Sequence, residues 1–150
     1  MKCEPLEIAA SKTVLGLTPP EALPSAATAA LEAGCDSPSL RALAGLTDVE
    51  VDEARSLLER ALAELSLRLP SERDAVMRLA REIAAQVLEG KTSPYQGAKE
   101  IWELSLRLPG ESLSDLDSFV YAASEWEDRP EDRNLFAEGI VAAARELVRG

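Results

Sequence analysis

The chain of 150 residues is 46% hydrophobic and 29% charged, which fits a single globular domain of ordinary size. It contains no histidine, so mechanisms that need an imidazole base, a Ser-His or Cys-His pair or a histidine-bearing metal site are excluded. Sixteen basic and 27 acidic residues give a net charge of −11, which argues against binding to nucleic acid or to an anionic membrane.

The abundance of Ala and Leu, the few β-branched residues and the lack of strand-length alternation predict an all-α protein. We expect a compact irregular bundle of about five main helices plus two or three short N-terminal ones, in a single domain over residues 1–150. In chain order, Gly, Pro and apolar spacing place these helices at about residues 4–15, 25–32, 37–45, 47–69, 76–87, 93–109, 116–126 and 130–147.

Four of the predicted helix starts carry a capping signal. Ser25 is suited to cap the helix that runs to residue 32. Ser37 and Ser93 each precede a proline, a pair typical of a helix that begins with a capping hydroxyl and a first-turn proline. Thr47 and Glu50 have the spacing of a capping box, which predicts a helix start at residue 47.

The N-terminal residues and the two cysteines bear on the cellular location. No stretch is apolar over the roughly 18 residues that cross a bilayer, and no apolar signal-peptide region follows residues 1–5. We therefore expect a cytoplasmic protein. Cys3 and Cys35 are then predicted to be free thiols, because they lack the spacing of a redox motif and are too few to ligate zinc.

The heptapeptide ELSLRLP occurs twice, at residues 64–70 and 103–109. Its offset fits two helix-turn-helix units, but the similarity decays outside the seven residues and repeat arrays need about three units. We favour the simpler interpretation that both copies are helix ends stopped by proline.

No cofactor and no metal site is predicted. The densest acidic run comprises Glu111, Asp115, Asp117, Glu125, Glu127, Asp128, Glu131 and Asp132. It lacks the pattern of a calcium-binding loop, and motifs for nucleotide binding and acyl transfer are missing from the sequence. Glu125 and Asp128 lie three residues apart and could share a cation or an arginine, although a solvated acidic face is the simpler interpretation.

Two aromatic segments are the candidate interaction surface. In residues 93–102, Tyr95 and Trp102 flank a small Gly97-Ala98 face, which indicates either core packing under a neighbouring helix or a surface anchor for a partner. In residues 124–130, Trp126 stands among carboxylates and is expected to be half exposed. The candidate residues are Tyr95, Trp102, Glu125, Trp126, Glu127 and Asp128.

Three segments carry a resemblance: residues 34–46 (GCDSPSLRALAGL), 94–102 (PYQGAKEIW) and 123–128 (ASEWED), together with Phe119. In order and spacing they resemble a family of small bacterial all-helical proteins without an assigned function. The resemblance implies one cytosolic domain and brings no activity. The recurrent positions of that family correspond to Ser37, Pro38, Arg41, Gly45, Pro94, Tyr95, Gly97, Trp102, Glu125, Trp126 and Asp128.

These observations favour a non-catalytic helical domain that binds another protein, for example an immunity or regulatory protein that engages a basic partner. One alternative is an enzyme, or a protein that binds a metal or a small ligand, with a pocket near Arg41, Tyr95, Trp102 and Glu125. Another is a structural subunit whose apolar face closes a homo-oligomer.

Overall fold

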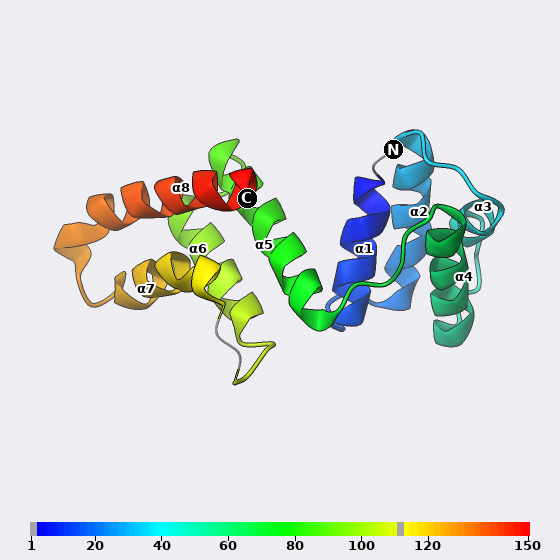
Figure 1. The fold of residues 1–150 in the computed structure, drawn as a ribbon, viewed down its shortest axis with the longest axis horizontal. Helices are drawn as coiled ribbons and strands as arrows, with labels where there is room; N and C mark the ends of the chain where they lie inside the picture. The colour runs from blue at the N-terminus through cyan, green and yellow to red at the C-terminus, as the bar shows by residue number, and fades with distance from the viewer. Residues whose placement is uncertain (1–2, 111–112) are drawn as a thin grey trace. The chain divides into compact units, whose positions relative to one another are not determined.

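The computed structural model of the chain describes residues 3–110 and 113–150, and within these ranges it contains helices and turns without a strand. The predicted all-α class is confirmed. The chain divides into two compact units, Met1–Ala75 and Val76–Gly150 (Figure 1). The single domain expected over residues 1–150 stays a prediction.

The first unit packs four α-helices around an aliphatic core. Its elements are α1 (Glu4–Val14), a 3-10 turn η1 (Pro20–Ala22), α2 (Leu23–Glu32), α3 (Pro38–Ala44) and α4 (Val51–Glu64). Helix α2 contacts α1 and α3, and α3 contacts α4. Because residues 1–75 contain no aromatic side chain, this core is filled by Leu, Ala and the two cysteines.

Local sequence predicts some of these helix starts and misses others. The Ser37 side chain accepts a hydrogen bond of 3.1 Å from the backbone N–H of Leu40, so the predicted cap of α3 is confirmed. The capping box at Thr47 and Glu50 is wrong, because α4 begins at Val51 and Glu50 makes no capping hydrogen bond with its side chain. The predicted cap at Ser25 is also wrong, because α2 already begins at Leu23.

A carboxylate from α4 completes the start of α3. Glu64 accepts hydrogen bonds from the Ser39 hydroxyl (2.7 Å) and from the Ser39 backbone N–H (2.9 Å). These two bonds hold the pKa of Glu64 below its ordinary value because they favour the charged form. The bond from the Ser39 hydroxyl has the larger effect. This contact joins α3 to α4 through two residues that are 25 positions apart in the sequence.

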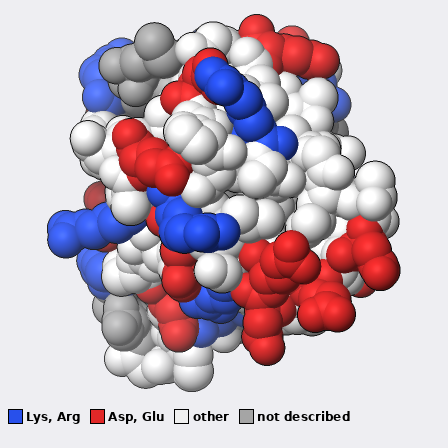
Figure 2. Space-filling model, turned by 90° about the vertical axis from the view of Figure 1, so that its right-hand side faces the viewer, with Lys and Arg blue, Asp and Glu red and all other residues white. Residues whose placement is uncertain are grey.

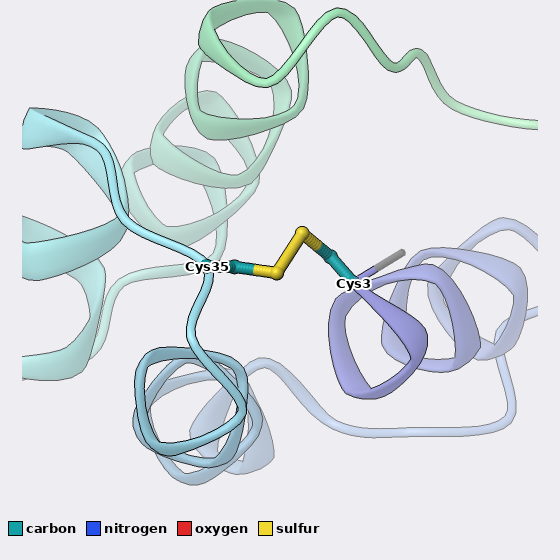
Figure 3. The surroundings of a disulfide bond; sticks show 2 residues. All are labelled: Cys3 and Cys35. Carbon is teal, nitrogen blue, oxygen red and sulfur yellow. A yellow bond between two sulfur atoms is a disulfide. The ribbon is translucent and has the colours of Figure 1, made fainter. Parts of the chain in front are cut away.

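The two cysteines form a disulfide bond, which corrects the prediction of free thiols (Figure 3). Cys3 precedes α1 and Cys35 lies in the loop after α2, with 5.9 Å between their Cα atoms. Gly34, with φ of +100°, allows the chain to leave α2 so that the Cys35 N–H bonds the Ala30 carbonyl. Both cysteines are almost fully buried, at 2% and 0% exposure. The spacing of the two cysteines in the sequence did not predict the disulfide, because the pairing depends on how α1 packs beside α2.

The second unit contains most of α5 (Glu72–Leu88), then α6 (Pro94–Ser105), a 3-10 turn η2 (Ser114–Leu116), α7 (Asp117–Glu125), a 3-10 turn η3 (Pro130–Asp132) and α8 (Arg133–Arg149). Helix α6 contacts α7 and α8, and α7 contacts α8. Phe119, Ile101 and Ile140 are fully buried between them. The predicted cap of α6 is confirmed, because the Ser93 hydroxyl accepts from the Gln96 N–H at 3.1 Å.

The two copies of ELSLRLP adopt different structures. In the first copy α4 ends at Glu64, and Ser66 takes a left-handed conformation (φ 59°) that lets the Leu67 N–H bond the Leu62 carbonyl. In the second copy α6 continues to Ser105 and the chain then turns. The heptapeptide is therefore not a structural repeat. Both helices end before the prolines at positions 70 and 109, so the expectation that proline stops them is not met.

The surface charge and the length of the apolar helices were compared with the expectation of no nucleic-acid or membrane partner. On the face drawn in Figure 2, basic and acidic side chains are interspersed among uncharged ones rather than separated into one basic surface. None of the helices in the described ranges is both long and apolar enough to span a membrane.

Candidate functional site

The centre of the candidate site is a stacked pair of rings in the second unit. Tyr95, in the first turn of α6, lies against Trp126, the residue that follows α7, with 4.8 Å between the ring centroids and 20° between the ring planes. Both side chains are partly exposed. The fold therefore brings together two of the predicted aromatic residues and presents them as a rigid pair, which loses little conformational entropy on binding.

Arg133, at the start of α8, holds Trp126 in place. Its guanidinium carbon lies 5.5 Å from the centroid of the Trp126 ring, and its Nε donates a hydrogen bond of 2.9 Å to the Trp126 carbonyl. The same side chain is 3.5 Å from the carboxylate of Glu127. Arg133 thus satisfies a carbonyl at the end of α7 and makes a cation–π contact with the exposed ring.

A second cluster lies one turn earlier on α7. Tyr121 meets Phe136 edge to face, with 5.9 Å between the ring centroids. The guanidinium of Arg129 lies 5.4 Å from the centroid of the Phe136 ring and donates a hydrogen bond of 3.1 Å to the Tyr121 hydroxyl. Its bond to Asp132, at 2.5 Å, raises the pKa of Arg129 because it stabilises the cation.

The remaining candidate residues are distributed as follows. Glu125 is the last residue of α7 and is partly buried, whereas Asp128 is exposed in the following turn. Trp102 is partly exposed and lines an apolar hollow of about 440 Å³ beside Leu106 and Val120. The predicted surface therefore separates into a group around Trp126 and an isolated Trp102. We call Tyr95, Glu125, Trp126, Glu127 and Asp128 the Trp126 surface.

The four residues of the predicted alternative pocket, Arg41, Tyr95, Trp102 and Glu125, belong to different units. Arg41 belongs to the first unit, where it pairs with Asp36 at 2.6 Å. This pairing lowers the pKa of Asp36, chiefly through the hydrogen bond from Arg41. The other three residues belong to the second unit.

The sequence did not indicate Arg129 and Arg133 as parts of the site. Arg133 reaches Trp126 because the chain reverses through η3, which places residues seven apart in sequence against each other. Tyr121, which is 46% exposed, and Phe136 were not among the candidate residues either. The proline at position 130 was the one local signal of this reversal.

Residues 114–139 carry more than half of the net charge of the chain. They contain eight carboxylates and two arginines, so their net charge is −6 out of −11. Both arginines are paired with carboxylates, Arg129 with Asp132 and Arg133 with Glu127. Glu111, which the predicted acidic run also included, lies outside the described residues. Where the structure is described, no group of three or more Cys, Asp or Glu side chains is placed to hold a metal ion.

Comparison with known proteins adds no assignment. No family model, curated protein or solved structure matches this chain. The resemblance to a family of small bacterial helical proteins stays a prediction.

Proposed function

We propose that this chain is a non-catalytic helical domain that binds a basic region of another protein through the Trp126 surface. One observation carries the proposal: the partly exposed ring of Trp126, which stacks on Tyr95, belongs to residues 114–139, whose net charge is −6. Aromatic anchors supply contact area at protein interfaces, and surrounding carboxylates favour a partner rich in Lys or Arg. An immunity or regulatory protein acting on a basic effector fits this chemistry.

The charges around the rings support a basic rather than an acidic partner. Arg133 and Arg129 are already engaged by Glu127 and Asp132, and each also lies over a ring. Glu125 and Asp128 make no ion pair within the described residues. A cation from a partner would therefore meet carboxylates that have no internal counter-charge.

The proposal is tested by capture followed by titration. The immobilised full chain is used to enrich proteins from a lysate, and each enriched protein is then purified and titrated against the wild type, Trp126→Ala and Glu125→Lys. The control is Glu53→Lys, which makes the same charge change at an exposed position of α4 in the first unit. We expect the two site variants to weaken binding at least about tenfold and the control to leave it unchanged. Equal binding by all four proteins would refute the proposed surface.

The cytoplasmic location stays a prediction and needs its own test, because buried disulfides are uncommon in the reducing cytosol. Cells are quenched in acid, and the chain is unfolded and alkylated before any reductant is added. Alkylation of Cys3 and Cys35 would support a cytoplasmic location. Protection of both until a reductant is added would contradict it and favour an oxidising compartment.

A further inference from the structure

The second unit has an open apolar groove between α7 and α8. The groove has a volume of about 400 Å³, and it is lined by Asp117, Ser118 and Tyr121 of α7 and by Leu135, Phe136 and Gly139 of α8. We call it the α7–α8 groove. Two of its apolar side chains face solvent, because Tyr121 is 46% exposed and Leu135 is 63% exposed. Exposed large apolar side chains that border one groove mark a binding surface more often than scattered single ones do.

Gly139 shows that the chain itself does not fill this groove. A glycine inside a helix costs roughly 0.5–1 kcal/mol relative to alanine, so we ask what a side chain would meet at each helical glycine of this unit. At Gly97 a Cβ would overlap the Val87 side chain of α5. At Gly139 a Cβ would meet no atom within 4 Å. The missing side chain at Gly139 therefore leaves space that an external group can enter.

The charges near the groove select the kind of occupant. Asp117 lines the groove, and Glu138 directly precedes the lining residue Gly139 on α8. Neither carboxylate makes an ion pair within residues 3–110 and 113–150. An occupant with an apolar stripe and flanking cations would bury Leu135 and neutralise this rim.

We infer that the α7–α8 groove binds an amphipathic helix of a partner protein, with apolar side chains seated over Gly139 and Lys or Arg residues against the rim carboxylates. The groove lies between two helices, and an amphipathic helix presents apolar anchors at intervals that suit such a groove. This inference rests on the proposed function and specifies the part of the partner that is bound. Arg129 links the groove to the Trp126 surface. It follows Asp128 in the sequence, donates a hydrogen bond to the Tyr121 hydroxyl and lies over the Phe136 ring.

The probe is a fluorescent peptide of Leu and Lys, about 18 residues or five helical turns long, with Leu at helical spacing. Two control peptides keep the length: one has the same composition with Leu at every second position, and one has Glu in place of Lys. Binding to the full chain is followed by fluorescence anisotropy. We expect saturable binding of the helical Lys peptide that is at least about tenfold tighter than binding of either control peptide.

Three protein variants locate the binding. Gly139→Phe introduces a ring at the groove position where a Cβ meets no atom within 4 Å, and Leu135→Asn removes the exposed apolar side chain of Leu135. Val51→Asn is the matched control, because Val51 is 62% exposed on α4 of the first unit and Leu135 is 63% exposed. We expect the two groove variants to weaken peptide binding at least about tenfold and Val51→Asn to leave it unchanged.

The inference is overturned if the peptide does not bind saturably, or if Gly139→Phe binds it as the wild type does. It is also overturned if light scattering finds a wild-type dimer that Gly139→Phe converts to a monomer while the peptide does not compete, because a second copy would then occupy the groove. A captured partner that binds Gly139→Phe normally but loses affinity for Trp126→Ala would leave the proposed function intact and refute the groove alone.

Discussion

Reduction of the disulfide is expected to destabilise the first unit. The bond joins residues separated by 32 positions, and the loss of loop-closure entropy in the unfolded chain corresponds to about 4 kcal/mol at 25 °C in the chain-entropy description. Small domains are stable by only about 5–15 kcal/mol. For a unit of this size, each kcal/mol shifts the melting temperature by roughly 4–8 °C, so we expect a decrease of roughly 15–30 °C.

The distribution of tryptophan makes it possible to follow the unfolding of the second unit separately from that of the whole chain. Both tryptophans lie in the second unit, so tryptophan fluorescence monitors that unit, whereas far-UV circular dichroism monitors the helices of both. Hydrogen exchange by mass spectrometry, with and without reductant, then localises the change. We expect protection to fall in peptides from α1 and from the loop before α3, on either side of the Cys3–Cys35 bond.

Peptides from α8 serve as the internal reference, and a Cys3→Ser/Cys35→Ser variant serves as the control for reagent effects, because reductant should not alter it further. Equal protection of α1 in the oxidised and reduced protein would show that the disulfide does not stabilise the first unit. It would mean that helix packing alone fixes the first unit and that the cross-link adds no stability.

Three further predictions concern stability. Because the pKa of Glu64 is lowered in the folded state, its stabilising effect is present above the ordinary pKa of 4.5 and is lost as the pH falls through the lower folded value. Glu64→Gln should therefore flatten this part of the pH profile of the urea midpoint, while the exposed Glu59→Gln should not; identical profiles would contradict the assignment. Gly139→Ala should stabilise the second unit by roughly 0.5–1 kcal/mol in urea unfolding, because its Cβ meets open space, and a loss of stability would show that the groove is filled. Gly97→Ala should destabilise the same unit by about 1–3 kcal/mol because of overlap with α5, and an unchanged midpoint would disprove that close packing.

The features that the sequence predicted well are local ones. The Ser-Pro pairs at residues 37–38 and 93–94 begin helices because the capping hydroxyl and the donor it satisfies are three residues apart. Local signals also compete with one another. Thr47 and Glu50 have the right spacing for a cap, yet the chain stays in a loop until Val51. Identical heptapeptides end in different backbone conformations, so seven residues do not determine where a helix stops.

The features that the sequence missed depend on contacts distant in the chain. The Cys3–Cys35 bond requires the packing of α1 beside α2, and neither residue carries a motif. The Tyr95–Trp126 stack joins two segments that were predicted separately, so each ring was identified but their contact was not. The cation–π contact of Arg133 requires the chain reversal at η3. Composition and spacing were thus enough to select the candidate residues. How these residues are arranged in space could be seen only in the folded structure.

A basic segment of a partner protein is proposed to bind the second unit at the Trp126 surface and the α7–α8 groove. The most direct measurement is an NMR titration of the isotope-labelled full chain with the helical Lys-Leu peptide, followed by assignment of the shifted signals. We expect shifts confined to α7, α8 and the side chain of Trp126, with the backbone signals of α4 unchanged. Shifts spread evenly over the acidic residues of both units, or no shifts at all, would contradict the proposed binding.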